Sequence, residues 1–97
     1  MSAGDWKELY LACERGDIET VGYQLRRGVD PNYQHPEFMS TVLFASIKSG
    51  RGDIVRLLLD SGADPALKTD LENVNAWEAA ELYGRPDIVA ILGKKPD

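Results

Sequence analysis

Two helical patterns follow one another in residues 41–65, which read TVLFASIKSGRGDIVRLLLDSGADP. Residues 41–50 place small and apolar side chains at the 3.6-residue spacing of a short helix that begins at a capping threonine and ends at a glycine. Residues 53–62 predict a second helix, closed by Gly62 in the left-handed conformation. Pro65 cannot continue that helix. The stretch therefore predicts one helix–turn–helix unit.

The same pattern occurs three times at a step of 34 residues. The matching positions include Gly16, Gly50 and Gly84, Val21, Val55 and Val89, and the pairs Asp30 with Asp64 and Pro31 with Pro65. A fixed period between about 20 and 50 residues is typical of stacked supersecondary units rather than of a single globular core. The sequence thus predicts an all-α repeat solenoid, with further helices at residues 7–16, 17–25, 75–84 and 85–92.

These motifs resemble the ankyrin repeat. The resemblance rests on TVLFAS, on the run Gly-x-x-Asp-Ile-Val-x-Leu-Leu-Leu and on Gly-Ala-Asp-Pro, and it extends from about Asp5 to Leu92. It implies stacked helix-turn-helix ankyrin repeats with projecting hairpin loops at residues 30–40 and 64–74. We expect a single ankyrin-repeat domain over residues 1–97, with repeat 1 at about 5–36, repeat 2 at about 37–70 and repeat 3 at about 71–95.

The chain departs from the family pattern at several positions. Phe44 and Glu78 stand where the family has a histidine that hydrogen-bonds between repeats, which puts that network in doubt here. Met39 stands where the family has a glycine, and because methionine adopts the left-handed conformation poorly, we expect the first hairpin to differ in shape. Gln24 and Gly93 replace leucines, as expected of terminal repeats with polar outer faces.

Composition and charge exclude several classes of protein. The formal net charge is −5, and a duplex-binding protein normally carries a basic face, so we expect no nucleic-acid partner. The apolar runs are too short to span a membrane, so we expect no membrane association. The single cysteine cannot form an internal disulfide, which predicts a cytoplasmic location, with the nucleus as the alternative. We expect a monomer.

A search for chemistry finds no catalytic constellation, cofactor motif or metal site. His35 has no cysteine or histidine partner at metal-ligand spacing and is predicted to be a solvent-exposed turn residue. Cys13 is predicted to be a small buried apolar residue. Asp17, Asp53 and Asp87 recur at the start of the second helices, where a carboxylate caps the helix or complements its dipole. We therefore predict that the chain is not an enzyme.

The family resemblance implies a module that binds a protein or peptide on the concave surface of hairpins and first helices. The candidate contacts carried over by position are His35, Glu37, Phe38, Met39, Asp70, Glu72, Asn73, Glu14, Arg15, Lys48, Ser49, Leu82 and Tyr83. Apolar residues in a polar hairpin suggest binding, although Phe38 and Met39 could instead fold back over the helices. An alternative function is an aromatic-groove reader of a modified lysine or small ligand, with Trp77 and Glu78 as its local candidates.

Overall fold

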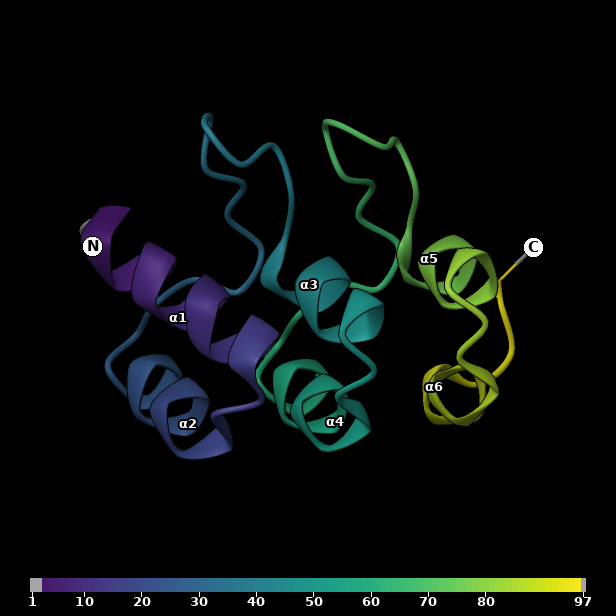
Figure 1. Cartoon of the computed structure of the whole chain (residues 1–97), viewed down its shortest axis with the longest axis horizontal. Coiled ribbons are helices and arrows are strands. Elements are labelled where there is room, and N and C mark those ends of the chain that lie inside the picture. The colour runs from purple at the N-terminus through teal and green to yellow at the C-terminus, as the bar shows by residue number, and fades with distance from the viewer. Residues whose placement is uncertain (1–2, 97) are drawn as a thin grey trace.

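The computed structural model describes residues 3–96, which form six helices and no strand. The first helices of the three units lie in one layer and the second helices in another, and two long loops project from the first layer (Figure 1). This arrangement confirms the predicted all-α solenoid. The helices are α1 (Ala3–Arg15), α2 (Ile18–Arg26), α3 (Val42–Lys48), α4 (Gly52–Asp60), α5 (Ala76–Leu82) and α6 (Pro86–Leu92).

Two helices, α2 and α3, begin directly after the residues that the sequence predicts as their caps. The Thr41 hydroxyl accepts the backbone N–H of Phe44 at 3.0 Å, and the Asp17 carboxylate accepts that of Thr20 at 3.2 Å. These side chains satisfy backbone donors that the first turn of a helix leaves free. Asn75 and Glu78 form a reciprocal capping box, in which each side chain accepts the other residue's backbone N–H at 3.0 Å.

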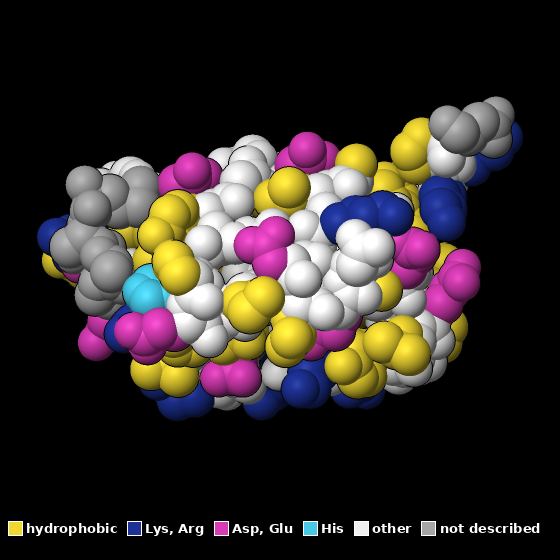
Figure 2. Space-filling view, turned by 90° about the horizontal axis from the view of Figure 1, so that it is seen from above, with side chains coloured by type: hydrophobic (Ala, Val, Ile, Leu, Met, Phe, Trp, Pro, Cys, Tyr) yellow, Lys and Arg dark blue, Asp and Glu magenta, His cyan; other side chains and the backbone are white. Residues whose placement is uncertain are grey.

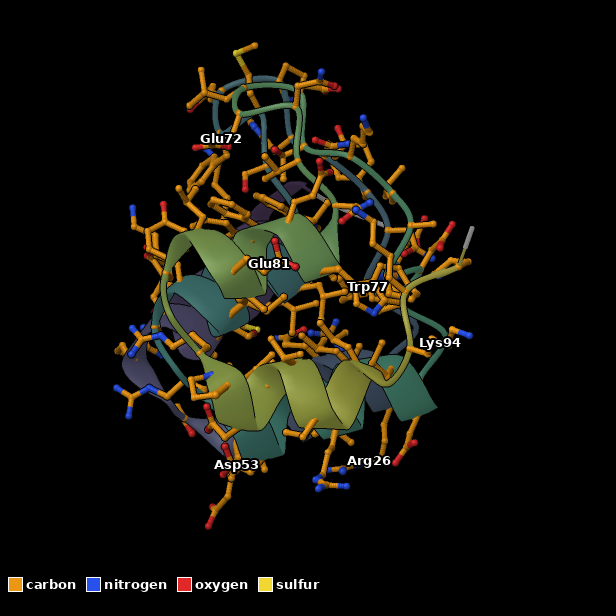
Figure 3. All side chains as sticks on the ribbon, turned by 90° about the vertical axis from the view of Figure 1, so that its right-hand side faces the viewer. Arg26, Asp53, Glu72, Trp77, Glu81 and Lys94 are labelled. Atoms are coloured by element: carbon orange, nitrogen blue, oxygen red, sulfur yellow. The ribbon has the colours of Figure 1, made fainter. Side chains whose placement is uncertain are left out.

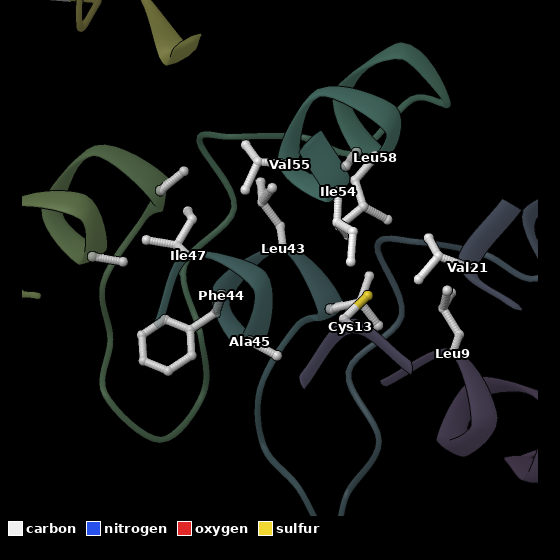
Figure 4. Close-up of a cluster of buried hydrophobic side chains, with 14 of the residues drawn as sticks. Leu9, Cys13, Val21, Leu43, Phe44, Ala45, Ile47, Ile54, Val55 and Leu58 are labelled. Carbon is white, nitrogen blue, oxygen red and sulfur yellow. The ribbon is translucent and has the colours of Figure 1, made fainter. Parts of the chain in front are cut away.

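One hydrophobic core runs through all three units. Buried side chains from every helix pair belong to a single cluster that extends from Trp6 to Ile88. Figure 4 shows members of this cluster from the first two pairs, among them Leu9, Cys13 and Leu58, gathered between the helices. Because each unit buries its apolar face against its neighbour, the stability of one unit depends on the next.

Two arginines connect neighbouring units where the first helices end. Arg51 Nη2 donates to the carbonyl oxygen of Arg15 at 3.2 Å, and Arg85 Nη2 donates to that of Lys48 at 2.6 Å. Arg85 Nε also donates to the carbonyl oxygen of Ile47 at 3.3 Å. The last carbonyls of a helix have no partner within it, and a cation there complements the helix dipole. Guanidinium groups therefore make inter-repeat bonds in a chain that lacks the family histidine.

The prediction that Gln24 lies on a polar outer face is wrong. Gln24 is only 5% exposed, and its Oε1 has no hydrogen-bond partner in the described part of the chain. The repeat step explains the position of Gln24. It lies 34 residues before Leu58, so it occupies the equivalent position in its own unit, and Leu58 is fully buried in α4. A buried polar atom without a partner costs about 1 to 3 kcal/mol.

We expected Met39, which replaces the family glycine, to avoid the left-handed conformation and so change the shape of the first hairpin. That prediction is wrong at Met39. Met39 has a φ of 53° and Asn73 has a φ of 56°, so both adopt the left-handed conformation. The same backbone bond holds each one, since Met39 N–H donates to His35 O at 2.8 Å and Asn73 N–H donates to Thr69 O at 2.9 Å. The surrounding hairpin imposes this conformation on a methionine that does not favour it.

Candidate functional site

The two projecting loops, residues 30–40 (the first hairpin) and 64–74 (the second hairpin), are bonded to each other. The Gln34 side-chain amide donates to Lys68 O and accepts the Asp70 N–H, both at 2.8 Å. Near the tips, Leu71 N–H donates to Met39 O at 2.9 Å. We call this pair of bonded loops the hairpin ridge.

A second side-chain amide makes the same kind of connection at the base of the ridge. Asn32 Nδ2 donates to Gly62 O at 3.0 Å, and Asn32 Oδ1 accepts the Asp64 N–H at 2.7 Å. Each of the two amides thus donates once and accepts once across the units. Three side-chain bonds and one backbone bond join the two hairpins directly, and the bond to Gly62 O joins the first hairpin to the residues just before the second.

The ridge exposes three large apolar side chains: Tyr33, which is 41% exposed, and the pair Met39 and Leu71, whose backbones are bonded to each other. Met39 is 39% exposed and Leu71 is 63% exposed. Met39 was predicted from the sequence as a contact, but Leu71 was not. The signal for Leu71 was available, because it is an apolar residue in a polar loop, as Met39 is. Figure 2 shows the ridge side of the molecule, where apolar side chains lie in separate groups among neutral, acidic and basic ones.

The hairpins hold most of the net negative charge of the chain. They contain five carboxylates and one lysine, so they account for four of the five net negative charges. The predicted contacts Glu37, Asp70, Glu72 and Asn73 are all exposed on the hairpins. Figure 3 shows Glu72 on the second hairpin, at the opposite end of the molecule from Arg26 and Asp53 of the second helices.

His35 is buried, contrary to the prediction of an exposed turn residue. Its exposure is 7%, and its ring stacks on that of Trp6 with 5.7 Å between the ring centroids. The His35 Nδ1 accepts the Glu37 N–H at 3.1 Å, so this imidazole nitrogen supports the turn. The stacking partner comes from the first turns of α1, which is longer than the other first helices. His35 is therefore part of the support for the first hairpin.

Phe38 also belongs to this support. Its ring meets Trp6 edge-on at 5.2 Å and Tyr10 at 4.8 Å, and the side chain is half-buried against the core. Of the two interpretations left open by the sequence, folding back over the helix is the one that the geometry fits for Phe38. Met39, the next residue, remains exposed.

Tyr10 marks the place where the first layer of helices faces the ridge. Burial raises the pKa of its hydroxyl, and the negative charges of Glu14 and Glu72 raise it further. Glu14 lies near the end of α1 and Glu72 lies on the second hairpin. Carboxylates from two separate elements therefore both disfavour ionisation of the Tyr10 hydroxyl.

The remaining predicted contacts lie where the first helices end. Glu14, Arg15, Lys48 and Leu82 are exposed, whereas Ser49 and Tyr83 are half-buried. The Tyr83 ring packs edge-on against Phe44 at 5.9 Å, which joins the third unit to the second.

Comparison with known proteins agrees with this architecture. The family model for ankyrin repeats matches residues 9–97 in three copies. The chain belongs to the ankyrin-repeat family.

Among curated ankyrin-containing relatives, the human tRNA endonuclease ANKZF1 is 31% identical over 103 residues, and the mouse tRNA endonuclease ANKZF1 is 40% identical over 99 residues. Each match covers 95% of this chain but only 14% and 13% of the relative, respectively. The mouse 2-5A-dependent ribonuclease is 39% identical over 61 residues, which is 63% of this chain and 8% of the relative. The chain thus spans a small fraction of these relatives.

The residues suggested for a ligand-reading groove are used within the ankyrin fold itself. Trp77 is 8% exposed, and its Nε1 donates to Gly93 O at 3.1 Å. Figure 3 shows Trp77 pointing inward from α5, while Glu81 points outward from the end of the stack. Glu78 accepts a hydrogen bond in the capping box of α5. A cavity between repeats 2 and 3 has a volume of about 10 Å³, which is room for about one water molecule.

The thiol of Cys13 is also enclosed. Burial raises the pKa of the Cys13 thiol to about 12, and a hydrogen bond with Ser46 lowers it only in part, so the thiol stays protonated near neutral pH. No group of three or more His, Cys, Asp or Glu side chains within residues 3–96 is arranged to hold a metal ion. Over the same residues, no helix is long and apolar enough to cross a membrane.

Proposed function

We propose that this chain is a non-catalytic binding module that holds a protein or peptide against the hairpin ridge and the ends of the first helices. Ankyrin repeats are in general protein-interaction modules. One observation carries the choice of surface: the cross-hairpin bonds at Gln34 and Leu71 fix two exposed apolar side chains, Met39 and Leu71, on a rigid support. A surface that is ordered before binding loses less entropy when the partner docks.

The names of the relatives refer to RNA cleavage, and we propose that this chain does not perform that chemistry. The matches cover a small part of each relative. Cys13 is buried with a raised thiol pKa, and His35 is packed against Trp6. Neither side chain is open to a substrate, which supports a binding role.

Affinity capture with two matched variants tests the proposal. Met39→Ser with Leu71→Ser removes the apolar pair from the ridge, whereas Tyr23→Ser with Val89→Ser removes an exposed apolar pair from the second helices α2 and α6. We expect proteins captured from the native source by the wild-type chain to be lost with the first variant and kept with the second. Circular dichroism checks that both variants fold. Partners kept by the ridge variant and lost by its control would place the binding surface elsewhere.

A further inference from the structure

We infer that the segment bound by the hairpin ridge is a positively charged peptide with an apolar side chain between its cationic residues. This inference rests on the proposed function, because it names the chemistry of the partner at that same surface. It follows from how the charge of the chain is distributed and from what the ridge places beside its apolar pair.

The net negative charge of the chain is concentrated on the ridge. The hairpins carry four of the five net negative charges, so all the remaining residues together carry only one. A molecule with this distribution attracts cations toward one side, and this attraction raises the association rate of a basic partner. A phosphate backbone or an acidic peptide would be repelled from the same side.

The carboxylates next to the apolar pair are available to a partner. Asp70 and Glu72 flank Leu71 in the sequence and are exposed. The ion pairs of the described residues join Lys7 to Glu37 at 3.5 Å, Arg15 to Asp17 and Arg27 to Asp5. None of these pairs uses Asp70 or Glu72, so a basic side chain from a partner does not have to displace an internal cation.

Beyond the ridge, the exposed ends of the first helices carry both signs of charge, since Glu14 is acidic whereas Arg15 and Lys48 are basic. The carboxylates that lie beside the apolar pair are therefore Asp70 and Glu72, which precede and follow Leu71 and are both exposed. A peptide that placed its apolar side chain against Met39 and Leu71 would extend its neighbouring cations toward Asp70 and Glu72. The apolar contact supplies burial, and the carboxylates select the sign of the flanking charge.

Peptide selection with charge-reversed variants tests the inference. Random displayed peptides are selected on the full chain, and the enriched sequences are then synthesised and titrated. We expect enriched peptides with net positive charge around an apolar residue. Their affinity should fall by about tenfold for Asp70→Lys with Glu72→Lys, and it should also fall as salt is raised, because salt screens exposed charges. The control, Glu19→Lys with Asp60→Lys, makes the same charge change at exposed positions of α2 and α4 and should leave the affinity within about twofold.

The other outcomes separate this inference from the proposed function. Neutral or acidic peptides that bind wild type but not Met39→Ser with Leu71→Ser would overturn the inference and leave the binding surface in place. Basic peptides whose affinity does not depend on salt or on Asp70 and Glu72 would overturn it as well, as would an RNA oligonucleotide that binds more tightly than the peptides. Peptides that bind every ridge variant as tightly as wild type, but do not bind the control Glu19→Lys with Asp60→Lys, would overturn both proposals.

Discussion

The Gln34 side-chain amide reaches the backbone of the next hairpin, where it donates to Lys68 O and accepts the Asp70 N–H at 2.8 Å each. Lys68 lies one full repeat step after Gln34, so a residue in one unit bonds the backbone at its own equivalent position in the next. This relationship makes two loops behave as one surface.

We predict that Gln34→Ala lowers the free energy of unfolding by about 1 to 2 kcal/mol, because two hydrogen bonds are lost and each makes a small net contribution to stability. Urea unfolding measures this loss, and hydrogen exchange should show faster exchange of the Asp70 amide. Gln34→Glu is the matched control, since it keeps an acceptor for Asp70 N–H and loses the donor to Lys68 O. Unchanged exchange at Asp70 in the alanine variant would show that the hairpins are held together by other contacts.

Gln24→Leu should raise the free energy of unfolding by about 1 kcal/mol, because it removes a buried acceptor without a partner and adds apolar contact in the core. The equivalent leucine in the next unit is Leu58, and Leu58→Gln should cost several times more than the first change gains. Chemical denaturation of both variants measures the difference. A less stable Gln24→Leu would mean that the glutamine makes a favourable interaction in solution.

The Cys13 thiol should make stability fall at alkaline pH. Its folded pKa of about 12 lies above the unfolded value of about 8.5, so its contribution is complete below pH 8.5 and is lost as the pH rises toward 12. Cys13→Ala should remove this part of the alkaline loss, although the smaller side chain lowers stability at neutral pH. The measurement is the free energy of unfolding against pH for both chains.

The same burial predicts that a maleimide reacts with Cys13 far more slowly in the native chain than in urea. Fast native labelling would contradict the enclosed position of the thiol.

Met39→Gly should stabilise the fold and weaken partner binding at the same time. Glycine relieves the left-handed strain of about 1 kcal/mol, but it removes an exposed apolar side chain from the ridge. Asn73→Gly is the control, because asparagine tolerates the conformation and should gain less. Thermal unfolding and titration with a selected peptide separate the two effects. A Met39→Gly chain that is destabilised would show that the methionine side chain contributes more than its backbone costs.

Most of the fold could be predicted from the sequence because its short motifs serve local needs. Thr41 and Asp17 cap the helices that follow them, and such caps form regardless of the rest of the fold. Gly62 adopts a left-handed conformation that residues other than glycine disfavour. Those requirements can be read from a few adjacent residues. The helix layers and the projecting hairpins followed from them.

The candidate surface was harder to predict, because it depends on contacts between residues that do not recur. Trp6 lies 34 residues before Ser40 and 68 before Val74, so the other copies give no hint of a stacking tryptophan. The burial of His35 follows from that ring and therefore could not be seen from its own loop. Gln24 is different, since its alignment with Leu58 was visible and predicted an inward-facing side chain.

The arginine bonds give the stack a direction. Arg51 and Arg85 each reach back to close the first helix of the preceding unit, whereas the first unit has Asp17 at the equivalent position. The three units are therefore not interchangeable within the stack. In a rearranged chain with the first unit after the second, Asp17 would take the place of Arg85, and the carbonyl oxygen of Lys48 at the end of α3 would lose its guanidinium donor. The side chains at this position therefore favour one order of the repeats.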